Sequence, residues 1–329
     1  MSLVNSHALV SRILTLKDLC FYPGQRTFKR WVAPTLREIK RRQDKMGPQP
    51  PQRRSTFLEW NYQAELFAFG KRLNEQFAEE ALQQAFTDRS YVVREEARLR
   101  ELSVESPQLA LADNRPLVEA GERLVSDTVR RCLRASLPHA PEECISCAHS
   151  HLMSEDVLAK VSSGIGTRDL VLSADFPPEP ATLVRSLKAV VGALEASSGR
   201  DRAVRFVMDL VVTQLCGKNV YEMWSPEDPL SLVTAILSRR GAAPPEPRLL
   251  GQAAPNTILA VYHVGMYSDK QFMGAGWGET VSIAVESAAH NVLQRLFRVT
   301  ETFRPVTTEQ ILDCDRFNAP NMSVSEWNK

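Results

Sequence analysis

Two carboxylates, Glu119 and Glu122, are the first candidates for chemistry in this sequence. They are three residues apart in the segment 114–137, and side chains at that spacing share one face of a helix. Two carboxylates on one face can hold a divalent ion. The alternative is a solvated polar face, which the spacing by itself favours, because charged pairs of this kind are common on half-buried helices.

Thiols and imidazoles at short spacing form a second candidate, Cys144, Cys147, His149 and His151. Both side-chain types are zinc ligands. However, no second ligand pair follows elsewhere, and a Cys-X-His spacing is tight for tetrahedral closure. We therefore expect reduced thiols, as in a reducing compartment, with no metal and no cofactor.

The carboxylate pair must be positioned by a core helix over residues 114–137. Small and apolar residues recur there at spacings of three and four, which is typical of one buried helical stripe. Gly121 allows a neighbouring element to approach closely. The stripe consists of Leu117, Ala120, Leu124, Val125, Thr128, Val129 and Leu133.

Helical patterning extends over a whole domain, which we place at residues 57–225. Breaks at 103–107, 138–142 and 176–180 divide it. One helix is expected from Tyr62 to Leu73, another from Leu82 to Tyr91, and a nearly all-apolar helix from Phe206 to Leu215 closes the domain.

A second module, residues 226–300, follows the proline-rich hinge 225–229 and precedes a tail at 301–329. A short helix at 230–237, alternating strands at 257–267 and 271–275, and a final helix at 281–297 are predicted. The fold class expected is α+β with two domains, an all-α domain followed by an α-β-β-β-α module.

The N-terminal residues 1–30 are basic and carry a single acid, Asp18. Apolar residues among the cations suggest an amphipathic helix, the composition of a mitochondrial transit peptide. A frayed basic tail without a targeting role is the alternative. The cleavage site cannot be located from the sequence.

A basic arm, which we place at residues 31–56, is the strongest charge feature. Ten cations against two acids give residues 26–54 a net charge of +8. Residues 1–25 add +1, so residues 55–329 carry −8 in a chain whose total is +1. Such an arm on an acidic body is typical of a segment that enters folded RNA, because phosphate contacts release counterions. A solvated linker is the alternative. The candidate RNA-binding residues are Arg26, Lys29, Arg30, Arg37, Lys40, Arg41, Arg42, Lys45, Arg53 and Arg54.

Three blocks resemble the ribonuclease III family. Residues 114–122 resemble its signature Asn-Glu-Arg-Leu-Glu-Phe-Leu-Gly-Asp, residues 85–91 its Ala-Leu-Thr-His-Arg-Ser-Tyr, and residues 188–194 its Glu-Ala-Leu-Ile-Gly-Ala. With a double-stranded-RNA-binding-like module, the resemblance covers roughly residues 60–297. It is nearest to the members of this family found in the mitochondrial large ribosomal subunit.

The departures from the enzyme pattern are informative. The resemblance places the family's five acidic positions on Arg115, Val118, Glu122, Arg185 and Lys188, of which only Glu122 is acidic. Ribonuclease III enzymes hold Mg²⁺ with these acids. A like-charge pair about 4 Å apart costs roughly 1 kcal/mol in water and about 4 kcal/mol at a dielectric near 20, and Mg²⁺ doubles that repulsion. We therefore expect no catalytic residue and no metal. A one-residue slip would align Glu119 instead, but the second helix stays basic.

The second module also departs from its family. Its phosphate-gripping lysine positions fall on Val281, Ser282 and Val285, and residues 228–297 carry five cations and five acids. The start of the final helix retains free N–H groups that can meet a phosphate. We expect a docking surface without sequence-independent duplex binding.

The resemblance implies a non-catalytic component of the large ribosomal subunit in the mitochondrial matrix. Its expected partners are ribosomal RNA, neighbouring ribosomal proteins and, as in the enzymes, a second ribonuclease III-like chain. It would support the assembly or stability of nascent mitochondrial polypeptides. One alternative is an active double-strand endoribonuclease that processes mitochondrial RNA through Glu122 and Glu119. Another is a ribosome-independent RNA chaperone. No apolar run reaches the roughly 18 residues of a membrane span.

Overall fold

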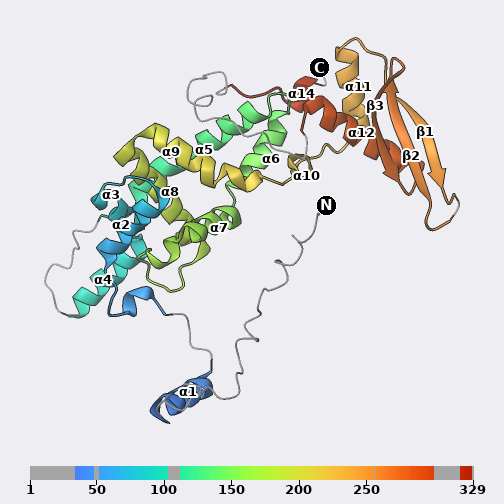
Figure 1. Ribbon diagram of the computed structural model, residues 1–329. Coiled ribbons are helices and arrows are strands. Elements are labelled where there is room, and N and C mark those ends of the chain that lie inside the picture. Colours follow the sequence, from blue (N-terminus) through green and yellow to red (C-terminus); the bar gives the residue numbers. More distant parts are fainter. Residues whose placement is uncertain (1–33, 48–51, 103–111, 256, 300–318, 328–329) are drawn as a thin grey trace, which may run out of the picture. The chain divides into compact units, whose positions relative to one another are not determined.

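The computed structural model describes residues 34–47, 52–102, 112–255, 257–299 and 319–327 (Figure 1). The chain forms two compact units, Met1–Pro51 and Gln52–Lys329. In the first unit, helix α1 spans Pro34–Met46. Its cations are exposed, and so are its apolar residues Leu36 and Ile39. No helix within the described ranges is long and apolar enough to cross a bilayer.

The second unit begins with a helical domain, and its longest helix, α5, packs against α8 in the middle of the hydrophobic core. The helices are α2 (Tyr62–Leu73), α3 (Glu79–Phe86), α4 (Arg89–Glu101), α5 (Arg115–Ser136), α6 (Glu142–Leu152), α7 (Glu155–Ile165), α8 (Pro180–Ser198), α9 (Arg200–Leu210) and α10 (Val220–Met223). Short 3₁₀ turns occur at Arg54–Thr56, Thr167–Asp169 and Val212–Leu215.

The crossing of α5 and α8 depends on two glycines, Gly121 and Gly192. A Cβ atom on Gly121 would overlap the carbonyl oxygen of Lys188, and one on Gly192 would overlap that of Leu117. The two backbones can approach this closely only because neither residue has a side chain. The close approach predicted at Gly121 is confirmed.

The single helix expected from Leu82 to Tyr91 is wrong, because the chain breaks between α3 and α4 at Thr87 and Asp88. The backbone N–H of Asp88 donates to the carbonyl of Leu172 at 3.0 Å, outside any helix. Its carboxylate then caps α4 by accepting from the N–H of Ser90.

The helix expected from Phe206 to Leu215 is also interrupted. Helix α9 ends at Leu210, and the chain continues through the 3₁₀ turn Val212–Leu215. Val212 and Leu215 are buried nonetheless, so the apolar run reflects burial on all sides and not one continuous helix.

The C-terminal module has the expected α-β-β-β-α order (Figure 1). It contains α11 (Pro229–Arg239), β1 (Glu246–Ala253), β2 (Val261–Ser268), β3 (Gln271–Gly278) and α12 (Val281–Phe297), followed by the short α14 (Val324–Trp327). The strands form one antiparallel sheet in the order β1-β2-β3, and α12 packs against β2 and β3. The α+β fold class with two domains is confirmed, and α12 has the predicted bounds.

Candidate functional site

The α5–α8 crossing brings Glu122 of α5 into contact with Lys188 of α8. Nζ of Lys188 lies 2.8 Å from Oε1 of Glu122. The lysine side chain is only 15% exposed, whereas that of the glutamate is 53% exposed. The lysine side chain is therefore less accessible to solvent than the carboxylate that it binds.

A second cation of α8, Arg185, binds the buried carboxylate of Asp88. Nε of Arg185 is 3.1 Å from Oδ1 of Asp88, whose side chain is 4% exposed. Oδ2 accepts hydrogen bonds from the N–H of Ser90 at 3.1 Å and from its hydroxyl at 2.6 Å. Burial by itself would raise the pKa of Asp88, but the hydrogen bonds from Ser90 and the charge of Arg185 outweigh it and lower the pKa. Asp88 is therefore an anion at neutral pH.

The other two α5 positions that the family resemblance singled out, Arg115 and Val118, add no carboxylate at the α5–α8 crossing. Nε of Arg115 lies 3.7 Å from the carboxylate of Asp113, and Val118 is half-buried against the core. Glu119 lies 4.0 Å from Arg123 on an exposed part of the helix. The two acids of the predicted pair, Glu119 and Glu122, are thus each beside a different cation.

The donor set at this crossing does not fit Mg²⁺. A magnesium ion takes oxygen ligands in octahedral geometry, and carboxylates in its sites face the ion. Here Glu122 and Asp88 face Lys188 and Arg185 instead. Across the residues that the structure describes, no group of three His, Cys, Asp or Glu side chains has the geometry to hold a metal ion.

The cysteines and histidines considered as zinc ligands lie on α6, and the two histidines contact different neighbours. Cys144 is buried, which raises the pKa of its thiol to about 12. His149 Nε2 lies 3.1 Å from the hydroxyl of Ser126 on α5, and His151 Nε2 lies 2.9 Å from Nζ of Lys218. Burial lowers the pKa of both imidazoles, and Arg130 and Lys218 respectively lower it further.

The basic arm divides into two parts that differ in their contacts. Arg26, Lys29 and Arg30 lie outside the described residues. Arg37, Lys40, Arg41, Arg42 and Lys45 are exposed on α1, where Arg42 pairs with Glu38 at 3.4 Å.

The two arginines after α1 are bound to the helical domain. The guanidinium of Arg53 donates to the carbonyls of Ser173 and Ala174, both at 2.9 Å. Arg54 lies 3.7 Å from the carboxylate of Asp169. The guanidinium of Arg53 is therefore committed to an intramolecular contact, whereas the cations of α1 face solvent.

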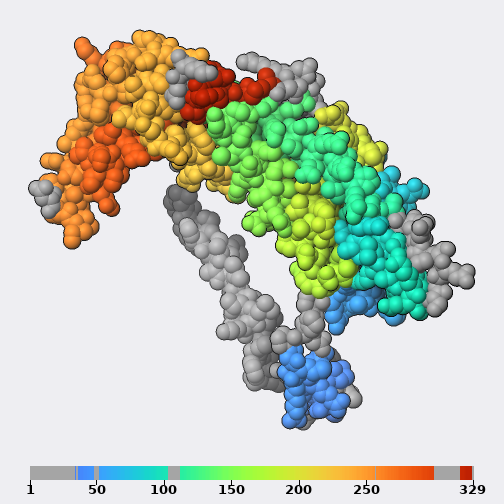
Figure 2. All heavy atoms as spheres, turned by 180° about the vertical axis from the view of Figure 1, so that it is seen from behind, coloured from blue at the N-terminus to red at the C-terminus, as the bar shows by residue number. Residues whose placement is uncertain are grey.

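A contact that sequence reasoning missed is made by the C-terminal segment 319–327. The side-chain amide of Asn321 donates to the carbonyls of Leu137 and Ala140 at 3.0 and 2.9 Å, and its backbone N–H donates to Glu142 at 2.8 Å. Trp327 packs beside Phe297 of α12. In Figure 2 this red segment lies between the green helices and the orange module. The apolar residues Val324 and Trp327 near the end of the chain were the available signal.

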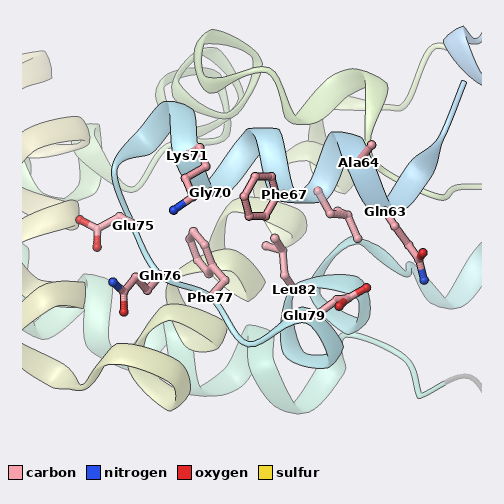
Figure 3. A pocket seen from close by; sticks show the side chains of 11 residues that line it. Gln63, Ala64, Phe67, Gly70, Lys71, Glu75, Gln76, Phe77, Glu79 and Leu82 are labelled. Carbon is pink, nitrogen blue, oxygen red and sulfur yellow. The ribbon is translucent and has the colours of Figure 1, made fainter.

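A surface hollow of about 490 Å³ lies between α2 and α3 (Figure 3). Phe67, Phe77 and Leu82 form its apolar part, and Lys71 and Glu79 lie at its rim. None of the residues predicted from the sequence to bind RNA or metal lines it.

Two family models match separate segments of this chain. A family model described as "Large ribosomal subunit protein mL44, endonuclease domain" matches residues 61–194, and one described as "MRPL44 dsRNA-binding domain" matches residues 224–328. The large ribosomal subunit protein mL44 of Caenorhabditis elegans is 31% identical over 312 residues, which cover 90% of this chain and 76% of the relative.

Bacterial enzymes are also similar. Ribonuclease 3 of Symbiobacterium thermophilum is 28% identical over 220 residues, covering 62% of this chain and 89% of the enzyme. Among solved structures, the nuclease domain of ribonuclease III from Campylobacter jejuni is 19% identical with a TM-score of 0.37, covering 44% of this chain and 93% of that one.

Proposed function

The chain belongs to the family of the large ribosomal subunit protein mL44, and from this premise we propose that it is a structural, non-catalytic component of the mitochondrial large ribosomal subunit. In this role it binds ribosomal RNA and neighbouring ribosomal proteins in the matrix and supports the assembly or stability of nascent mitochondrial polypeptides. Residues 1–30 serve as transit peptide, 31–56 as RNA arm, 57–225 and 226–300 as folded domains, and 301–329 as tail.

One observation carries the absence of catalysis, namely the contact between Lys188 and Glu122. The ammonium is 2.8 Å from the carboxylate and is largely shielded from water. A divalent ion at Glu122 would have to displace this cation and would then meet Arg185 one helical turn away on α8. Both charges repel it.

The cations of α1 support the RNA-binding part of the proposal. They are exposed on one helix. RNA phosphates are the partner that their charge favours, because each phosphate contact releases counterions. A second ribonuclease III-like chain remains a proposed partner, since the enzymes of this fold pair.

Fractionation tests the structural role. In a sucrose gradient of mitochondrial lysate, the chain should sediment with large subunits and should shift to the top only when the subunits are dissociated. If the chain is found entirely in the light fractions of a gradient in which the large subunits are intact, the proposal is contradicted.

Purified protein tests the absence of catalysis. Duplex RNA incubated with the chain and Mg²⁺ should stay intact, as it should with the Glu122→Gln variant. Cleavage by the wild-type chain that Glu122→Gln abolishes would establish the endoribonuclease alternative.

A further inference from the structure

We propose that one end of the C-terminal module is a docking site for a basic, apolar segment of another protein. We call this surface the end patch and define it by six exposed or half-exposed residues: Ile258, Leu259, Val261, Trp277, Val281 and Ile283. This protein contact is separate from the RNA contact of the arm, and it gives a chemical identity to one of the proposed protein neighbours.

The sheet topology places these residues at the same end. Strand β2 begins where β3 ends, because Tyr262 pairs with Gly278 and His263 with Trp277. Val261 at the start of β2 also pairs with Ala253, the last residue of β1. The β1–β2 connection that carries Ile258 and Leu259 therefore emerges beside the junction of β3 and α12.

The start of α12 adjoins this end directly. A Cβ atom on Gly278 would lie 2.9 Å from Cγ2 of Ile283, so the helix begins against the last residue of β3. Val281 and Ile283 are exposed, whereas Ala284 and Ala288 on the inner face are buried. The two exposed residues thus contribute little to the core, and their apolar surface faces solvent.

The apolar side chains of the β1–β2 connection are exposed on a hydrogen-bonded backbone. Ile258 is 101% exposed and Leu259 is 80% exposed, although the loop backbone is held by hydrogen bonds from Thr257 to Ala254 and from Ala260 to Thr257. Trp277 is stacked on His263 with ring centroids 3.7 Å apart and exposes its other face. Ordered apolar side chains gathered on a surface are typical of an interaction site.

The charges around the end patch decide which partner fits. Between residues 249 and 294 the charged residues are Asp269 and Lys270, in the β2–β3 turn at the opposite end, and Glu279 and Glu286, at the start of α12. Both glutamates are exposed, and no ion pair of the described residues includes either. The segments that form the end patch thus contribute two negative charges and no lysine or arginine.

This charge disfavours an RNA backbone and favours a cationic protein segment. Phosphates would be repelled by Glu279 and Glu286, and no lysine or arginine is present to release counterions. A segment with alternating apolar and basic residues would bury the apolar side chains and pair with both glutamates, which is the usual form of electrostatic complementarity between proteins.

Binding of designed probes to the purified full-length chain tests this assignment. The probes are a fluorescent 14-residue peptide of leucine and lysine, its leucine and glutamate counterpart, and a 16-base-pair RNA duplex. Anisotropy should show that the lysine peptide binds and the other two bind at least tenfold more weakly. The double variant Ile258→Ser with Leu259→Ser should weaken lysine-peptide binding at least about tenfold, because two apolar side chains would lose their burial.

Two further variants make the result specific. Leu58→Ser removes an equally exposed leucine outside the module and should leave binding unchanged. Glu279→Gln with Glu286→Gln should remove most of the preference for the lysine peptide. The assignment is overturned if Leu58→Ser and the end-patch variant weaken binding equally, if the glutamate peptide binds as tightly, or if duplex RNA binds through Ile258 and Leu259.

The outcome is independent of the proposed structural role. An end-patch variant that still sediments with large subunits, in a test where the lysine peptide shows no binding, would refute only the docking site. A chain that never sediments with large subunits would refute the structural role and leave the measured peptide affinity standing.

Discussion

Neutralising four cations of α1 should flatten the salt dependence of RNA binding. Arg37, Lys40, Arg41 and Lys45 are spaced by three and four residues, which places them on one face of α1. Arg42 is left unchanged because it pairs with Glu38. Each phosphate contact contributes roughly 0.7–0.9 to the slope of log affinity against log salt, so losing four lowers the slope by about 3.

The magnitude is large enough to measure directly. A slope difference of about 3 means that, between about 50 and about 200 mM salt, the wild-type chain loses about 60-fold more affinity than the glutamine variant. Filter binding or anisotropy with a structured ribosomal RNA fragment at five salt concentrations gives both slopes. Because the changed side chains lie on α1, in the first compact unit, the stability of the helical domain should be unaffected.

A matched control separates position from total charge. Glutamine at Lys160, Arg168, Arg200 and Arg205 removes the same number of exposed cations from the acidic body. This variant should keep the wild-type slope. Equal flattening in both variants would refute the reasoning, because affinity would then follow net charge and not the arm.

Three further predictions concern the folded body. Gly121→Ala should lower the free energy of unfolding, measured in urea, by at least about 3 kcal/mol, because ordinary overpacking costs roughly 1–3 kcal/mol and this Cβ atom would meet backbone atoms that cannot easily move. The control Gly164→Ala places its Cβ atom in open space and should raise the free energy of unfolding by about 0.5–1 kcal/mol. The pKa of Asp88 is lower in the folded chain than its unfolded value of about 3.9. The stability that this carboxylate contributes is therefore complete above the unfolded pKa and is lost as pH falls through the folded pKa. In acid unfolding curves, the difference in unfolding free energy between wild type and Asp88→Asn should therefore narrow below about pH 4. Asn321→Ala removes two hydrogen bonds to carbonyls that follow α5, so it should cost about 1–3 kcal/mol and speed proteolysis of the C-terminal segment.

Elements with a buried stripe were predictable from the sequence, and elements without one were not. Helix α12 has the predicted bounds because its apolar residues repeat at helical spacing against the sheet. Strand β1 gave no signal because every one of its residues is exposed, which removes the alternation that marks a half-buried strand. The break at Asp88 was visible only as a capping preference, which the helical periodicity on both sides concealed.

The residue types at the α5–α8 crossing could be read from the sequence, but their pairings could not. The aligned positions pointed to Arg185 and Lys188, yet their partners are 97 and 66 residues away in the chain. Asp88 in particular carried no signal as a partner, because its position in the sequence block reads as part of a helix. Only the packing of α3, α5 and α8 brings these charges together.

The arrangement of charge at the crossing predicts that a single substitution of a cation by an acid would not create a metal site. A buried carboxylate or ammonium without a partner is strongly destabilising, and here Asp88 binds Arg185 while Glu122 binds Lys188. Lys188→Glu would set two carboxylates against each other and leave Arg185 beside them. In the proposed structural role, Lys188 supplies Glu122 with the positive charge that a metal ion supplies in the enzymes. That charge is covalently fixed to α8, so it holds the two helices together without requiring a bound ion.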